Sequence, residues 1–182
     1  VTGGAERVRY YVNVGFTMED GIYKQDNLNA YKTNANLQRY SFRSNVDIDI
    51  TRTVNMNLGI GGIVDERHYP GNSGIGIFDA AKRTSPISFP VRNPDGSPGG
   101  VNTYIGSNPW GMATQSGYSA DRHHTIQANF GLKWDLGNLI TKGLSVNGKF
   151  AYDLYYYTKA ERAKQFEVKQ YLGKDETTGE DM

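Results

Sequence analysis

Apolar and polar residues alternate along five long segments of the chain. Between Tyr40 and Ile50 the even-numbered positions are apolar except Ser44, and the odd-numbered ones are Ser, Arg, Asn or Asp. Successive side chains of a strand point to opposite faces, so this segment has one apolar and one polar face. The pattern falters at Gly61–Ile63, which predicts a bulge or a bend there. The same period of two predicts strands at Val8–Phe16, Tyr40–Ile50, Val54–Glu66, His124–Leu136 and Leu144–Tyr156.

The connections between these segments alternate between long and short. Polar stretches at Thr17–Leu37, Arg67–Arg122 and Thr158–Met182 alternate with short links at Thr51–Thr53 and Gly137–Gly143. Strands of about a dozen residues exceed the ~5–6 usual in soluble sheets and suffice for the ~9–11 that cross a bilayer. Long extracellular loops and short periplasmic turns are typical of outer-membrane barrels. The pattern therefore predicts an all-β fold, a segment of an antiparallel up-and-down transmembrane β-barrel with about five long strands.

The composition excludes several classes of protein and of site. The 182 residues include 20 Lys and Arg against 19 Asp and Glu, and no Cys. A near-zero net charge argues against a nucleic-acid binder, and the lack of Cys excludes disulfides and thiolate metal sites. No apolar run approaches the ~20 residues of a membrane-spanning helix. The 22 Gly, 13 Tyr, 7 Phe and 2 Trp favour strands and turns.

Aromatic residues lie near the ends of the expected strands. One group is expected towards the long loops and comprises Phe16, Tyr40, Phe42, Tyr152 and Tyr156. Trp134 is expected near a short turn. Membrane barrels carry aromatic girdles at both interfaces, although aromatic residues are also good strand formers in general.

Six short segments, spread over nearly the whole chain, match the motifs of one protein family in order and rough spacing. They are Gly3–Val12, Asp20–Lys24, Arg39–Asp47, Glu66–Gly71, Asn93–Ser97 and Thr141–Val146. Together they resemble the barrel of SusC/RagA-type TonB-linked (TonB-dependent) outer-membrane transporters of the Bacteroidetes. The segment Asn72–Ala120 resembles the family least.

The resemblance implies a role in transport. Members of the family are large barrels that import glycans or peptides beneath a SusD-like surface lipoprotein. The resemblance implies that residues 1–182 are a partial barrel domain, with no plug domain, TonB-contacting segment or signal peptide. It places the protein in the outer membrane of a Gram-negative bacterium. The implied partners are outer-membrane lipid, a SusD-like lipoprotein, the TonB complex through the missing plug region, and an oligosaccharide or peptide substrate, with no nucleic acid.

Charged residues on the polar face are the candidate functional contacts. Arg39, Arg43, Asp47 and Asp49 share one face of the second strand, and Arg9 is expected on its neighbour. In a barrel these side chains face the lumen, where they contact substrate or the plug. The alternative is that they only keep a water-filled interior polar. The sequence leaves both interpretations open.

Enzymatic and metal chemistry find little support in the sequence. His123 and His124 are adjacent in a strand and point to opposite faces, so they are badly placed to chelate one ion. The acidic pairs Glu19–Asp20 and Asp65–Glu66 are expected to be solvated in loops. Neither a nucleophile-elbow nor a P-loop motif is present. We therefore predict no enzyme, no cofactor and no metal site.

A second hypothesis comes from a different class of protein. A soluble secreted β-sheet binding module would bury the same apolar face against a second sheet. The two hypotheses differ in what covers the even-numbered face, which is protein in the module and lipid in the barrel.

Overall fold

The computed structural model describes residues 1–27, 29–104 and 107–182. The described residues form strands β1 (Thr2–Ala5), β2 (Val8–Asp20), β3 (Asn36–Asp49), β4 (Val54–Pro70), β5 (Gly117–Asp135) and β6 (Ser145–Ala163). They also form helices α1 (Gly74–Arg83), α2 (Pro109–Thr114) and a 3-10 turn at Asn102–Tyr104.

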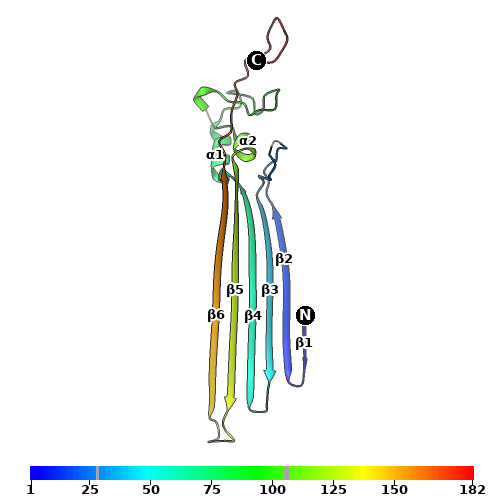
Figure 1. The fold of residues 1–182 in the computed structure, drawn as a ribbon, viewed down its shortest axis with the longest axis vertical. Coiled ribbons are helices and arrows are strands. Elements are labelled where there is room, and N and C mark those ends of the chain that lie inside the picture. The colour runs from blue at the N-terminus through cyan, green and yellow to red at the C-terminus, as the bar shows by residue number, and fades with distance from the viewer. Residues whose placement is uncertain (28, 105–106) are drawn as a thin grey trace. The chain divides into compact units, whose positions relative to one another are not determined.

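All six described strands belong to one sheet, in the order β1 to β6 along the chain (Figure 1). The expected all-β, antiparallel, up-and-down arrangement with five long strands is confirmed. The sixth strand, β1, was not predicted because Gly3 and Gly4 give it no alternating pattern. It pairs antiparallel with β2, from Thr2 opposite Tyr11 to Ala5 opposite Val8.

The long strands extend further towards the long connections than the sequence predicts. Strand β5 begins at Gly117 rather than His124, and β6 continues to Ala163 rather than Tyr156. In these extensions polar residues occupy both faces, so the period of two is lost. The backbone pairing continues without it.

The chain divides into two compact units. The first comprises residues 1–18, 38–66 and 122–158 and contains most of the sheet. The second comprises residues 19–37, 67–121 and 159–182 and contains both helices.

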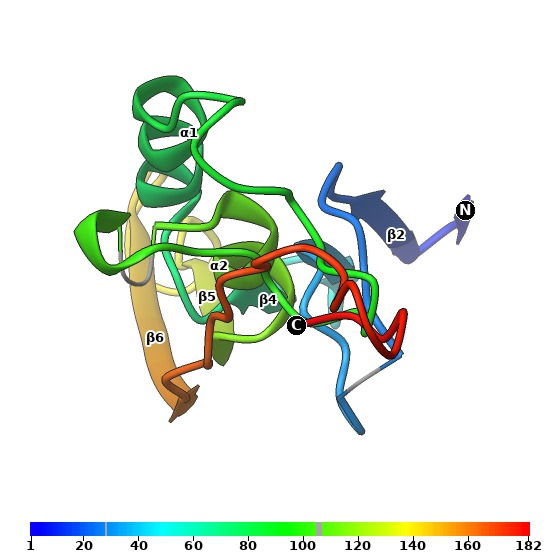
Figure 2. The ribbon, with the colours of Figure 1, turned by 90° about the horizontal axis from the view of Figure 1, so that it is seen from above.

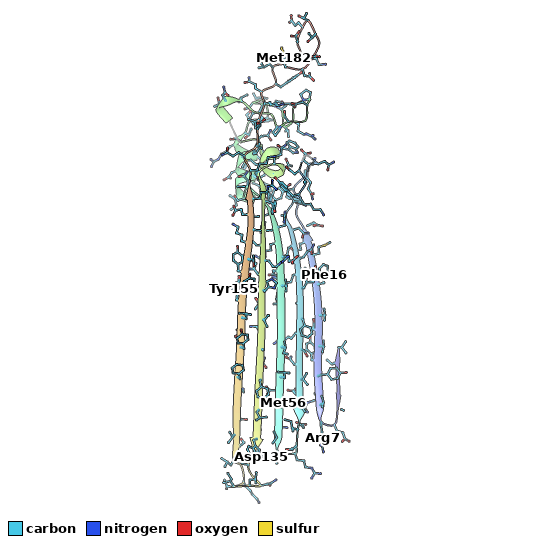
Figure 3. The ribbon with its side chains drawn as sticks, viewed as in Figure 1. Arg7, Phe16, Met56, Asp135, Tyr155 and Met182 are labelled. Atoms are coloured by element: carbon cyan, nitrogen blue, oxygen red, sulfur yellow. The ribbon has the colours of Figure 1, made fainter. Side chains whose placement is uncertain are left out.

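The even-numbered face of the first unit is apolar and exposed. Val14 is 77% exposed and Phe150 is 64% exposed. Figure 3 shows side chains projecting along the strands. Other exposed apolar residues at even positions include Phe16, Met18, Phe42, Ile60, Ile126, Phe130, Leu132, Trp134, Val146, Tyr152 and Leu154.

Hydrophobic burial in the described residues is confined to the second unit, at Ile77 and Ala113. The sheet therefore has no apolar core of its own.

Strand β4 keeps one register with β3 past its adjacent glycines. Asn55 donates a hydrogen bond to Asp49, and Arg39 donates to Asp65. From Asp49 back to Arg39 is ten residues of β3, and from Asn55 to Asp65 is ten residues of β4, so neither strand contains an extra residue between the two contacts. The expected bulge at Gly61–Ile63 is therefore wrong. The alternation falters there because a glycine falls on the apolar face and an isoleucine on the polar face.

Aromatic rings form a row on the even-numbered face. The Phe16 and Tyr40 ring centroids are 5.1 Å apart, and those of His124 and Tyr156 are 5.9 Å apart. Trp134, ten residues along β5 from His124, is 46% exposed near the other end of the strand. The positions agree with the expected aromatic groups.

Charged and polar groups lie on the same face, two residues nearer to the long connections than the aromatic row. Arg122, two residues before His124, forms an ion pair with Glu66 at 2.7 Å between Nη2 and Oε1. The Tyr40 hydroxyl donates to the side chain of Gln38 at 3.1 Å. The even-numbered face thus changes from apolar to polar within about two residues of the aromatic row.

The second unit contains two helices within the long third connection, and these lie side by side (Figure 2). The Ser73 hydroxyl caps α1 by accepting from the Gly76 N–H at 3.1 Å, and Lys82 and Arg83 stand in its last turn. Both features are favourable at helix ends. Within the described residues, neither helix has the length and apolar character needed to cross a membrane.

Candidate functional site on the polar face of the sheet

Odd-numbered residues of β2 to β6 share the polar face of the first unit. The close approach of two glycine–asparagine pairs shows which residues of β4 and β5 lie opposite one another. A Cβ added at Gly59 would meet the Asn129 side chain, and one at Gly131 would meet Asn57. Because glycine has no side chain, these amides lie flat across the neighbouring strand. The face is therefore polar, and the two amides cover these glycines.

Arg39 and Asp65 form a two-pronged ion pair on this face. Arg39 Nε donates to Asp65 Oδ1 at 2.6 Å, and Nη2 donates to Oδ2 at 2.9 Å. Asp65 is only 7% exposed. Such planar pairing matches the guanidinium to the carboxylate and fixes both side chains.

The expectation that Asp65–Glu66 is a solvated loop pair is wrong. Both residues lie within β4, where successive side chains point to opposite faces. Asp65 pairs with Arg39 on the polar face, and Glu66 pairs with Arg122 on the other. The two carboxylates therefore do not share a site.

The remaining candidate residues occupy the polar face in register. The Asp49 N–H donates to the Arg7 carbonyl at 2.8 Å, which places Arg9 opposite Asp47 on the adjacent strand. Asp49 accepts from Asn55. Arg9 thus lies on the strand neighbouring Asp47, as the sequence predicts, but what these charges contact in function stays a prediction.

Arg43 lines a groove of about 480 Å³ on the polar face. Tyr11, Asn45, Gln127 and Asp153 also line it, from strands β2, β3, β5 and β6. Sequence reasoning missed the groove, because its shape depends on where Gly59 and Gly61 of β4 fall between the side chains of the neighbouring strands. The signal was present in Gly59 and Gly61 at odd positions of a strand.

Histidine and tyrosine side chains cluster elsewhere on the same face. His123 Nδ1 lies 2.6 Å from the Tyr155 hydroxyl, and its ring centroid is 4.7 Å from that of Tyr157. His124 instead contacts Tyr156. The two histidines thus engage separate partners, as opposite faces require. Among the described residues, no three His, Cys, Asp or Glu side chains gather as a metal site would need.

A buried asparagine organises the second unit. Asn108 is 0% exposed, and its Oδ1 accepts from the N–H groups of Trp110 and Gly111 at 3.0 and 3.2 Å. Its Nδ2 donates to the carbonyls of Val91 and Gly99 at 2.9 and 2.8 Å. One side chain therefore caps α2 and ties two further loop segments to it.

The segment Asn93–Ser97 forms a tight turn. The Gly96 N–H donates to the Asn93 carbonyl at 2.9 Å, and the Asn93 N–H donates to the Ser97 carbonyl at 2.8 Å. Gly96 has φ +83°, which glycine adopts without strain. Proline second and glycine fourth suit a type I turn followed by a left-handed residue.

An exposed ion pair links this turn to the final segment. Lys169 Nζ donates to Asp95 Oδ2 at 2.8 Å, and the hydroxyl and N–H of Ser97 donate to Asp95 Oδ1. The Lys169 hydrogen bond, followed by those from Ser97, lowers the pKa of Asp95 well below its usual range. The same hydrogen bond raises the pKa of Lys169.

These shifts predict how pH affects the turn. The contribution of Asp95 is fully present above its unfolded pKa of 3.8 and is lost as pH falls through its lowered folded value. That of Lys169 is present below 10.5 and is lost above it. Amide hydrogen exchange at Ser97, corrected for intrinsic rates, should show constant protection from pH 5 to 9 and less below 3.8. Asp95→Asn should remove this acid dependence, and its persistence in the variant would contradict the assignment.

Comparison with known proteins adds the decisive observation. Two TonB-dependent receptors of Formosa agariphila are similar to the chain, one 27% identical over 139 residues and the other 28% identical over 130. Each match covers 71% of the chain. The chain is thus similar to TonB-dependent receptors. No family model matches it.

The match spans a small part of each TonB-dependent receptor, 13% of one and 12% of the other. Both relatives are receptors rather than enzymes, in agreement with the prediction that the chain is not an enzyme. The resemblance to TonB-dependent receptors is confirmed, while the narrower assignment to the SusC/RagA type stays a prediction.

Proposed function

We propose that the chain forms part of the barrel wall of an outer-membrane TonB-dependent importer of the SusC/RagA type. In this proposal residues 1–182 are part of the barrel domain, and the even-numbered face contacts lipid while the odd-numbered face lines a water-filled lumen. The observation that carries it is the exposed apolar face of a sheet without an apolar core. Barrels alternate apolar and polar residues in this way, whereas a soluble module needs protein over its apolar face.

The spacing of the aromatic residues supports the proposal. Ten residues separate His124 from Trp134 along β5. At about 3.3 Å per residue this is roughly 33 Å, and a barrel tilt of 35–45° reduces the height to about 23–27 Å. The apolar band of a membrane barrel is ≈ 25 Å tall and is flanked by aromatic girdles. The Glu66–Arg122 pair lies just beyond this band, where charges meet water.

The whole transporter would capture an oligosaccharide or a peptide with its extracellular loops, beneath a SusD-like lipoprotein. The TonB complex would then act through a plug domain in the lumen. The two F. agariphila receptors support the TonB-dependent part of this proposal. The lipoprotein and the substrate class rest on the sequence resemblance.

Epitope tags in the full-length protein on intact cells test the proposed sidedness. The connections 17–37 and 67–122 should face the outside, and 51–53 and 137–143 the periplasm. A tag inserted after Ile87, whose side chain is 93% exposed, should bind antibody without permeabilisation. A tag at Arg52 should bind only after permeabilisation. The reverse pattern would overturn the topology, and labelling of both tags without permeabilisation would contradict a membrane wall.

A further inference from the structure

The groove on the polar face contains one transverse row of side chains. Residues that lie directly opposite one another on neighbouring strands form such rows. The Asp49–Arg7 hydrogen bond aligns β3 with β2, and the Arg39–Asp65 and Asn55–Asp49 bonds align β4 with β3. The pairs Gly59–Asn129 and His124–Tyr156 align β5 with β4 and β6 with β5. The row through the groove runs across β2 to β6 and consists of Asn13, Arg43, Gly61, Gln127 and Asp153, all of which line the groove.

Opposite charges stand at two positions of this row. Arg43 lies on β3 and Asp153 on β6, three strand spacings apart, which at ≈ 4.8 Å each is about 14 Å. Within the described ranges neither side chain makes a hydrogen bond or an ion pair. At 14 Å they do not neutralise each other, so each retains its capacity to bind an opposite charge.

Neutral donors and acceptors occupy the space between the two charges. Amide side chains of Asn45, Gln127 and Asn129 line the groove, with hydroxyls of Ser41 and Thr125 nearby. An amide offers both a carbonyl acceptor and an N–H donor, which is the combination that a peptide backbone requires. The lining therefore suits a chain of peptide groups placed across the strands.

The floor of the groove is open at Gly61. The nearest heavy atom to a Cβ placed there is the Phe42 carbonyl oxygen at 3.8 Å, so the space above Gly61 is not filled by a neighbouring side chain. A glycine at such a point allows close approach of a ligand backbone. The backbone of Gly62, the next residue, also borders the groove, but a Cβ added there would point to the other side of the sheet, where its nearest atom is at 3.9 Å.

We infer that this groove binds a short zwitterionic peptide, with its carboxylate at Arg43 and its terminal ammonium at Asp153. An extended peptide spans at most ~3.3–3.6 Å per residue, so about four residues cover 14 Å. The inference rests on the proposed function in that it requires the polar face to line a water-filled lumen. It goes further by choosing a peptide over an oligosaccharide and by naming the groups that recognise its two ends.

Calorimetric titration of the purified full-length receptor with tetra-alanine tests the inference. Charge-assisted hydrogen bonds at the two ends should each contribute on the order of tenfold in affinity. Arg43→Gln should weaken binding of the free peptide by that factor but leave the C-amidated peptide unaffected. Asp153→Asn should do the same for the free peptide against the N-acetylated one.

Matched glycine variants test the location of the site. Gly61→Leu should abolish binding by filling the groove, whereas Gly62→Leu adds the same side chain to the apolar face and should leave binding unchanged. Both variants should fold, because neither added side chain meets a close neighbour at its Cβ. The heat-modifiable mobility of the receptor on SDS gels checks folding independently of binding.

The outcomes separate this inference from the proposed function. A correctly inserted receptor that binds no tetra-alanine, or binds it equally well with Leu at position 61, overturns the peptide site and leaves the transporter assignment intact. Binding of a neutral tetrasaccharide that is lost in Gly61→Leu and insensitive to Arg43→Gln also overturns it, in favour of a glycan groove. Failure of the tag experiment would instead contradict the barrel wall.

Discussion

Replacing Val46 with arginine is expected to destabilise the full-length protein by roughly 2–4 kcal/mol, because the proposed lipid face offers the charge no hydration at the middle of the bilayer. Val46 lies between the aromatic row at Tyr40 and the far end of β3, on the even-numbered face. The folded fraction in the outer membrane, measured by heat-modifiable mobility on SDS gels, should fall strongly. Urea unfolding in detergent should show the corresponding decrease in the free energy of unfolding.

Asn45 provides the matched control. It is the adjacent residue of β3, lines the groove on the polar face and has Arg43 on the same side. Asn45→Arg places its charge in water, so the folded yield should change little. The same contrast is expected at Ile48 and Asp49. An equal loss of folded yield from both substitutions of a pair would mean that protein covers both faces of the sheet, as in a soluble sandwich.

Replacing Asn108 with alanine should destabilise the second unit by roughly 2–5 kcal/mol. The change removes an N-cap, worth about 1 kcal/mol, and leaves buried backbone groups without partners at ≈ 1–3 kcal/mol each. The groups that lose this partner belong to Gly99, Trp110 and Gly111, whereas the Val91 carbonyl keeps a hydrogen bond from the Gly99 N–H at 3.5 Å. Limited proteolysis of the folded receptor should cleave this unit about 30-fold faster or more, because cleavage follows the population of the open form.

Two further variants check the role of Asn108. Asn108→Asp keeps the acceptor for the helix N-terminus but loses both hydrogen bonds to the carbonyls. This variant should therefore be much less resistant to protease than the wild type. Asn102→Ala alters an exposed asparagine of the same unit and should have no measurable effect. Wild-type resistance to protease in Asn108→Ala would refute the assigned role.

Most of the sheet could be predicted because the alternation of apolar and polar residues can be read within each strand alone. Alternation along a strand fixes which face each residue occupies, and the run from Tyr40 to Ile50 was enough to assign β3. The outer part of β6 from Thr158 to Ala163 was not predictable, since polar residues on both faces leave no period to detect. The short β1 was missed for a related reason, because its glycines carry no side chains.

The contacts of the polar face depend on register, which the sequence of one strand does not contain. The sequence predicts that Asp65 is a solvated loop acid, because its pairing with Arg39 follows only from the length of β4 and its alignment with β3. The groove likewise requires Gly61 to lie between Arg43 and Gln127. These three residues are far apart in the sequence and come together only when the strands pair. The helices of the second unit were hidden within a polar connection, and their caps at Ser73 and Asn108 are short-range signals that composition obscured.

In the proposed barrel wall, the unbroken pairing of β3 and β4 limits how the strands can move. Sliding one strand past another by a single residue would turn every side chain to the opposite face, and a slide of two residues would break the Arg39–Asp65 pair. Intermediate positions break the backbone hydrogen bonds between the strands and leave the side chains on neither the apolar nor the polar face. Opening and closing during a transport cycle would therefore fall to the loops and to whatever fills the lumen, while the strands act as a fixed frame.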